Sequence, residues 1–247
     1  MLISANELAG LLKRVFEGMG YTPGHYEDAA AMVSWLHLHG EDGLGELDRA
    51  LELVADRDRP ACQVVAEGPP TLIAECHGRS ALNCLPTLLE LACVQALDQG
   101  SIQVEIRHCH NRKFVLKLLT DCARQGLWAQ VCWDNGHAPV HRHIARIEAG
   151  AVCPYYQEYS VTEPSPQSER QSLTLALGTP AHPQPAWALE TARAERSITP
   201  ADFELAREQA LENGTEISPA LWQRLNRLAE AVLVENSERS RSGAGGR

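Results

Sequence analysis

The stretch WLHLHGEDGLGEL, residues 35–47, combines two histidines with acidic side chains and three glycines. Imidazole and carboxylate groups are common general acids and bases in enzymes, so this stretch is a candidate catalytic corner. The alternative is that it only ends a helix. In that case Gly40 takes a left-handed conformation, and His39 can be replaced at little cost in stability.

Three His-x-His pairs suggest metal binding. They are His37/His39, His108/His110 and His141/His143. Side chains two residues apart share a face only on a strand. We expect the first pair on a helix, the second just after a strand, and the third in a loop or at a helix start. Zinc needs three or four ligands, and no single stretch supplies them, so we assign no metal ligand.

Polar residues follow two expected strands, SIQVEIR and LWAQVCW. The first group is His108, His110 and Asn111, and the second is Asp134, Asn135 and His137. Ligands of open α/β sheets bind at the carboxyl ends of strands, so we expect the two groups to lie close together. No Gly-x-Gly-x-x-Gly follows a strand and no phosphate-binding lysine loop is present. No cofactor-binding residue is therefore assigned.

The apolar pattern predicts an α/β fold. Residues 1–56 have helical periodicity and a Ser4–Glu7 capping box, so we expect a helical subdomain there. Residues 57–180 are expected to form a mixed sheet that contains a βαβ unit. Residues 181–234 are expected to form helices that pack back, and residues 235–247 to form a disordered tail.

Composition restricts the partners. The formal charge is -10, which argues against nucleic acid, and no stretch is apolar and long enough to cross a bilayer. The first residues lack the pattern of a signal peptide, so a cytoplasmic location is expected. In a reducing compartment, the eight cysteines are expected to be buried thiols rather than disulfides.

Three stretches resemble the malate/L-lactate dehydrogenase-like family of NAD(P)H oxidoreductases, over about residues 5–160. WLHLHGEDGLGEL takes the place of the family's Gly-x-Asp-Ser-His-Gly motif, although the Ser-His pair is missing. IAECHGRSALNCLPTLLELACVQALDQGSIQVEIRHCHNRKF resembles the segment that brings a second histidine to the active site. ARQGLWAQVCWDNG resembles a strand that ends in asparagine. Separately, the two termini resemble an uncharacterised bacterial family of unknown function.

The resemblance implies site residues. His39, Asp42 and His110 are the catalytic candidates, and Arg107, Arg112 and Asn135 are the candidates for substrate binding. Reduction of a 2-oxo acid requires a general acid near the carbonyl and a cation for the carboxylate, roles that His39 and Arg107 or Arg112 would fill.

Loss of the Ser-His pair and of the glycine-rich cofactor contacts favours a diverged, catalytically impaired relative. Such a protein would bind a small carboxylic acid or a partner subunit, and it could be a homo-oligomer. The first alternative is an active reductase of 2-oxo or imino acids, for which NAD(P)H would be the cofactor. The second alternative is a metal-binding protein. Whether the chain is an enzyme stays open at this level.

Overall fold

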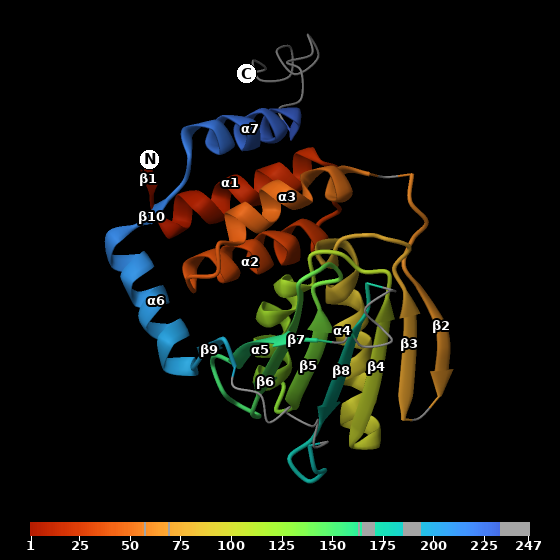
Figure 1. The fold of residues 1–247 in the computed structure, drawn as a ribbon. Coiled ribbons are helices and arrows are strands. Elements are labelled where there is room, and N and C mark those ends of the chain that lie inside the picture. Colours follow the sequence, from red (N-terminus) through yellow and green to blue (C-terminus); the bar gives the residue numbers. More distant parts are fainter. Residues whose placement is uncertain (57, 69, 163, 165–170, 185–193, 233–247) are drawn as a thin grey trace, which may run out of the picture.

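A computed structural model describes residues 1–56, 58–68, 70–162, 164, 171–184 and 194–232 (Figure 1). The helices are α1 (Ala5–Gly18), α2 (His25–Leu38), α3 (Gly43–Ala55), α4 (Ala81–Gln99), α5 (Val115–Arg124), α6 (Pro200–Asn213) and α7 (Pro219–Ala229), with the 3-10 turns η1 (Arg112–Phe114) and η3 (Glu230–Val232). The strands are β1 (Leu2–Ile3), β2 (Gln63–Gly68), β3 (Thr71–Glu75), β4 (Ser101–Arg107), β5 (Trp128–Asp134), β6 (Val140–Ile147), β7 (Tyr155–Val161), β8 (Leu173–Gly178), β9 (Arg196–Ile198) and β10 (Thr215–Glu216).

The N-terminal helices form a layer of their own at one end of the sheet (Figure 1). The capping box at Ser4 and Glu7 is present and starts α1, as expected. The apolar stripe of α1 is fully buried, and it packs against α2 and α7. The short strand β1 pairs with β10, so the C-terminal part packs back onto the N-terminal helices, as predicted.

Eight strands form one mixed sheet in the order β2-β3-β4-β8-β5-β6-β7-β9. Helices α4 and α5 pack on this sheet, and α2 contacts both of them. Strands β3 and β4 are parallel neighbours, and β2 and β3 form the expected antiparallel hairpin. The predicted α/β class with a mixed sheet is therefore confirmed.

Two expectations about the sheet were wrong. Strands β4 and β5 are parallel, but they are not neighbours, because β8 lies antiparallel between them. His141 and His143 lie on β6, not in a loop or at a helix start. The expected tail at 235–247 lies outside the described residues.

Candidate functional site

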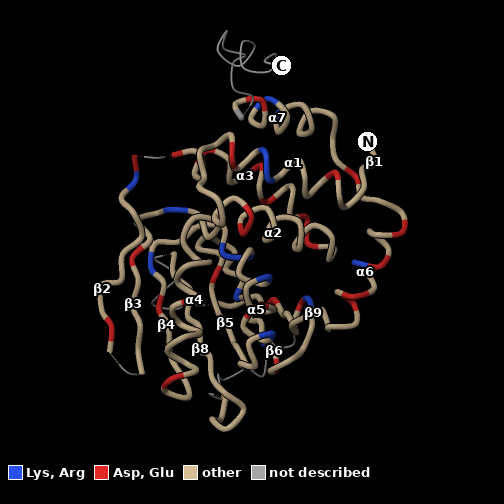
Figure 2. The backbone as a smooth tube through the Cα atoms, turned by 180° about the vertical axis from the view of Figure 1, so that it is seen from behind, with Lys and Arg blue, Asp and Glu red and all other residues tan. Residues whose placement is uncertain are grey.

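A cleft lies where α3 faces the ends of β4 and β5. Its volume is about 380 Å³. It is lined by Glu46, Arg49, Leu53, His110, Asn111, Arg112, Lys113, Trp133, Asn135, His137, His143 and Gln171. Several basic residues lie around α5 and β6 in Figure 2. As the sequence predicts, the polar residues that follow β4 and β5 meet here, although β8 separates the two strands.

Arg112 is the buried cation of the cleft, with 6% of its surface exposed. Its guanidinium donates to the carbonyl oxygens of Cys109 (2.9 Å) and Asp134 (2.7 Å) and to Oε1 of Gln171 (2.8 Å). All three acceptors are neutral, and its Nε has no hydrogen-bond partner among the described residues. Burial lowers the pKa of Arg112, which measures how poorly its charge is solvated. An anion in the cleft would compensate this charge.

Glu41, in the stretch WLHLHGEDGLGEL, connects the helical layer to the sheet. It is 3% exposed, and its carboxylate contacts Lys113 (2.6 Å) and Arg196. Arg196 also lies 3.4 Å from Glu158 on β7. This partly exposed network around the buried Glu41 carboxylate joins the α2–α3 turn to η1 and β9. A buried ion pair costs several kcal/mol when one partner is removed, so the network holds the helical layer in register with the sheet.

His143 forms a relay with two residues of β7. Its Nδ1 lies 2.8 Å from the hydroxyl of Tyr156, which donates to Glu158 at 2.5 Å. Because that hydroxyl has only one proton, Nδ1 of His143 must be the donor, and its Nε2 is left as an acceptor. The imidazole also stacks on Trp133, with 4.9 Å between ring centroids. Burial lowers the pKa of His143 to about 4, so it is neutral at pH 7.

His39 faces away from the cleft. Its Nδ1 is 2.6 Å from the carbonyl oxygen of Trp35, and the neighbouring aromatic ring of Phe203 belongs to α6. Only 6% of His39 is exposed, and burial lowers its pKa to about 4. Gly40 follows with φ +84, the left-handed conformation expected at a helix end. The structure therefore favours the interpretation of this stretch as a helix end.

Of the other predicted site residues, some line the cleft and some lie outside it. Asp42 caps α3 through Gly45, and its side chain is 69% exposed. Arg107 pairs with Glu105 of its own strand at 2.7 Å and is not among the cleft residues. His110, Arg112 and Asn135 line the cleft together. The amide of Asn135 donates to the carbonyl oxygen of Pro139 at 2.8 Å. Their proposed roles stay predictions.

Among the described residues, no His-x-His pair belongs to a group with the spacing of metal ligands. Nε2 of His37 bonds Thr215, whereas His39 bonds Trp35. His108 and His110 both line a second cavity, but His108 pairs there with Glu75 at 2.7 Å, and His110 also lines the cleft. Over the described parts of the chain, the one group with the spacing of metal ligands is Cys62, Cys76 and Cys84.

Two described glycines near the strand and helix ends, Gly136 and Gly43, offer no cradle for a pyrophosphate. A Cβ on Gly136, after β5, would lie 2.2 Å from the amide of Gln171. A Cβ on Gly43, at the start of α3, would lie 2.4 Å from the carbonyl oxygen of Val33. The space beside both glycines is therefore filled by the protein itself, whereas dinucleotide loops use glycine to let phosphate approach the backbone. Neither glycine therefore provides a place for a phosphate beside its backbone.

Sequence reasoning missed several residues of the cleft and its supporting network. These are Glu41, Arg49, Lys113, Trp133, His143 and Arg196. Lys113 directly follows Arg112, so a search for basic side chains after β4 would have found it. Arg196 has no such signal, since it reaches Glu41 across 155 residues of sequence.

Comparisons with known proteins agree on the fold. A model described as a protein of unknown function (DUF3726) matches residues 3–83. No curated protein matches the chain. A dehydrogenase from Sinorhizobium meliloti is similar in structure with a TM-score of 0.69 and 13% identity, over 93% of this chain and 99% of that one.

Two further structures extend the likeness. Sulfolactate dehydrogenase from Methanocaldococcus jannaschii has a TM-score of 0.65 and 13% identity, over 93% of this chain and 97% of that one. The Δ1-piperideine-2-carboxylate reductase from Pseudomonas syringae pv. tomato has a TM-score of 0.61 and 14% identity, over 92% and 99%. The chain thus has the fold of the malate/L-lactate dehydrogenase-like proteins. No described helix is long and apolar enough to span a membrane.

Proposed function

We propose that the protein binds a small carboxylic acid in the cleft and does not reduce it. The observation that carries the proposal is Arg112, a buried guanidinium whose hydrogen bonds all go to neutral acceptors. A carboxylate beside Arg112 would add a direct ion pair to the distant charge of Asp134 at the ends of β4 and β5. Oδ1 of Asn111, also buried and without a partner in the described chain, would accept a hydroxyl or amine proton of the same ligand.

The names of the similar structures support this class of ligand. Sulfolactate and Δ1-piperideine-2-carboxylate are both small carboxylates. Arg49 lies on the α3 side of the cleft and adds a second cation, although it also pairs with Glu46 at 2.9 Å. Trp133 provides an apolar wall. An acid bound between α3 and the sheet would therefore meet cations from both layers.

Two observations support the absence of reduction. The expected general acid, His39, is buried against Trp35 and Phe203, and the space beside Gly43 and Gly136 is filled by protein atoms. In the proposed function no hydride donor is held near the acid. The protein would then be a binding protein whose fold is also found in enzymes.

The second candidate is an active reductase that uses different residues. The observation that favours it is the His143–Tyr156–Glu158 relay beside the cleft. With Nδ1 occupied, Nε2 of His143 is an acceptor at neutral pH, so it would take the hydroxyl proton of a 2-hydroxy acid while the hydride passes to NAD(P)⁺. In the binding function the same nitrogen would only accept a hydrogen bond from that hydroxyl.

Calorimetric titration with pyruvate, oxalate and L-malate tests the proposal. We expect at least one acid to bind with a Kd of about 0.1 mM or below, which corresponds to roughly 5.5 kcal/mol. Arg112→Gln should weaken binding at least about tenfold, and Arg112→Lys should weaken it less because the charge is kept. Arg124→Gln, which removes a cation of α5 that is 69% exposed, is the control and should bind normally. Equal binding by Arg112→Gln, in folded protein, would overturn the proposal.

A further inference from the structure

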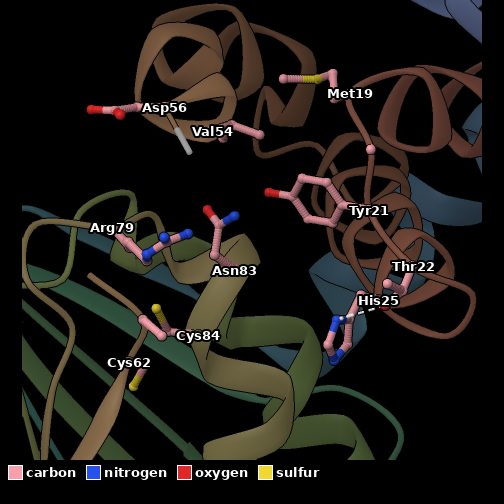
Figure 3. Close-up of a pocket in the computed structure, with 12 residues that line it drawn as sticks. Met19, Tyr21, Thr22, His25, Val54, Asp56, Cys62, Arg79, Asn83 and Cys84 are labelled. Atoms are coloured by element: carbon pink, nitrogen blue, oxygen red, sulfur yellow. Dashed lines mark hydrogen bonds between the residues drawn. The ribbon is translucent and has the colours of Figure 1, made fainter. Parts of the chain in front are cut away.

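A cluster of three thiols lies outside the cleft. The Sγ atoms of Cys62, Cys76 and Cys84 all lie within 4.8 Å of one another. Cys76 and Cys84 are buried, and Cys62 is partly exposed. Figure 3 shows Cys62 and Cys84 side by side on the wall of a pocket of about 320 Å³. None of these cysteines contributes to the proposed binding of an acid.

The fold brings the three thiols together from three segments. Gln63 of β2 pairs with Glu75 of β3, so Cys62 and Cys76 flank the same end of the hairpin. Cys84 lies in the first turns of α4, which begins at Ala81. Arg79 donates to the carbonyl oxygens of Arg59 and Pro60, and this fastens the segment before Cys62 to the turn after Cys76.

The spacing of the sulfurs fits one metal ion. Zinc binds thiolates at about 2.3 Å in tetrahedral geometry, which places neighbouring sulfurs about 3.8 Å apart. Sγ of Cys62 lies 3.7 Å from Sγ of Cys76. Cys93 and Cys122 form another close pair at 3.5 Å, but no third ligand joins them in the described chain. A substitution in the Cys93–Cys122 pair can therefore serve as the control for substitutions in the cluster of three thiols.

The surroundings suit bound thiolates. Three thiolates and Zn²⁺ carry a net charge of −1, and Arg79 lines the same pocket. The buried Oη of Tyr21 and Oδ1 of Asn83 also line it, and neither has a hydrogen-bond partner among the described residues (Figure 3).

We propose that Cys62, Cys76 and Cys84 bind one Zn²⁺ ion, whose fourth position faces the pocket beneath Tyr21 and Asn83. Thiolates select soft divalent ions such as Zn²⁺ over Mg²⁺ or Ca²⁺. Binding releases the thiol protons to solvent and involves no change of oxidation state. A site with three protein ligands leaves a position for water or a small ligand. The ion would also fasten the β2–β3 hairpin to α4.

Titration of reduced, metal-free protein with Co²⁺ and then Zn²⁺ tests this site. We expect one Co²⁺ per chain, with a thiolate-to-cobalt charge-transfer band and the intense visible bands of tetrahedral cobalt, and displacement by one equivalent of Zn²⁺. Cys62→Ser and Cys84→Ser should each weaken Zn²⁺ binding at least about a hundredfold. Cys93→Ser should leave both the spectrum and the stoichiometry unchanged.

Circular dichroism establishes that each variant is folded. Cys62 is the preferred position, because its partial exposure makes substitution tolerable. Absence of the charge-transfer band in folded wild-type protein would overturn the proposal. So would unchanged binding by both Cys62→Ser and Cys84→Ser, or a Cys62–Cys76 disulfide that persists under mild reductant and excludes the metal.

Discussion

The imidazole of His39 stacks on the indole of Trp35, with 4.1 Å between ring centroids and 20° between ring planes. The pair is spaced i, i+4 along the end of α2, and Phe203 of α6 closes over it. His39→Ala should therefore lower the free energy of unfolding by about 2 kcal/mol, more than expected for a partly exposed helix end. Binding of carboxylates should not change. Chemical denaturation and calorimetry measure both effects, and lost binding with unchanged stability would mean that His39 belongs to the site.

The pH dependence of stability follows from the buried histidines. The pKa values of His39 and His143 are both lowered from 6.5 to about 4 by burial. The unfolded chain then takes up protons that the folded chain does not, so stability is full above pH 6.5 and falls as the pH drops towards 4. His39 alone would contribute up to about 3 kcal/mol to this loss. Urea unfolding of His39→Phe at pH 7 and pH 4.5 should show a smaller fall than wild type, and an equal fall would contradict the assignment.

Gly40 and Gly10 form a matched pair. Gly40 has φ +84, so Gly40→Ala should cost about 1 kcal/mol, because a Cβ is penalised in this conformation. Gly10 lies inside α1, where an added Cβ meets nothing within 4 Å. Gly10→Ala should stabilise the protein by about 0.5–1 kcal/mol. The melting temperatures of the two variants should thus shift in opposite directions. If both shifted in the same direction, Gly40 would not be the left-handed residue that ends α2.

Glu41 and Asp42 are adjacent, but their substitutions should differ. Glu41→Gln removes the buried carboxylate that Lys113 and Arg196 share. It should cost about 2 kcal/mol, less than for a fully buried pair, because Arg196 is 42% exposed and keeps Glu158 as a partner. Asp42→Asn changes an exposed cap, and asparagine caps helices equally well, so the cost should stay below about 0.5 kcal/mol. Equal costs in denaturation experiments would show that the Glu41 network does not hold the two layers together.

Sequence reasoning predicted the parts of the fold that depend on local signals. The capping box at Ser4 starts α1 as expected, because capping involves residues only three positions apart. The insertion of β8 between β4 and β5 was not predictable in this way. Its register with β4, such as Val104 with Leu175, joins residues about 70 positions apart, which no local periodicity encodes.

The candidate site was predicted only where it follows strand ends. Asn135 directly follows the end of β5, so a rule about sheet edges found it. Arg112 lies five positions after the end of β4 and was assigned through the family resemblance. His143 was missed because the first half of β6 is polar and only partly buried, so it lacks apolar alternation. His39 was assigned to the site because sequence spacing does not reveal that Phe203, from a distant helix, packs against it.

The central claim is that the cleft binds a small acid without reducing it. The most direct measurement adds NADPH or NADH to the protein together with the tightest-binding 2-oxo acid and follows cofactor absorbance and fluorescence. We predict no oxidation above the uncatalysed rate and a cofactor Kd no tighter than about 1 mM, roughly 4 kcal/mol. The acid should still bind, and binding should require Arg112. Oxidation of the cofactor that depends on the acid, with a micromolar cofactor Kd, would contradict the claim and assign the protein to the reductases.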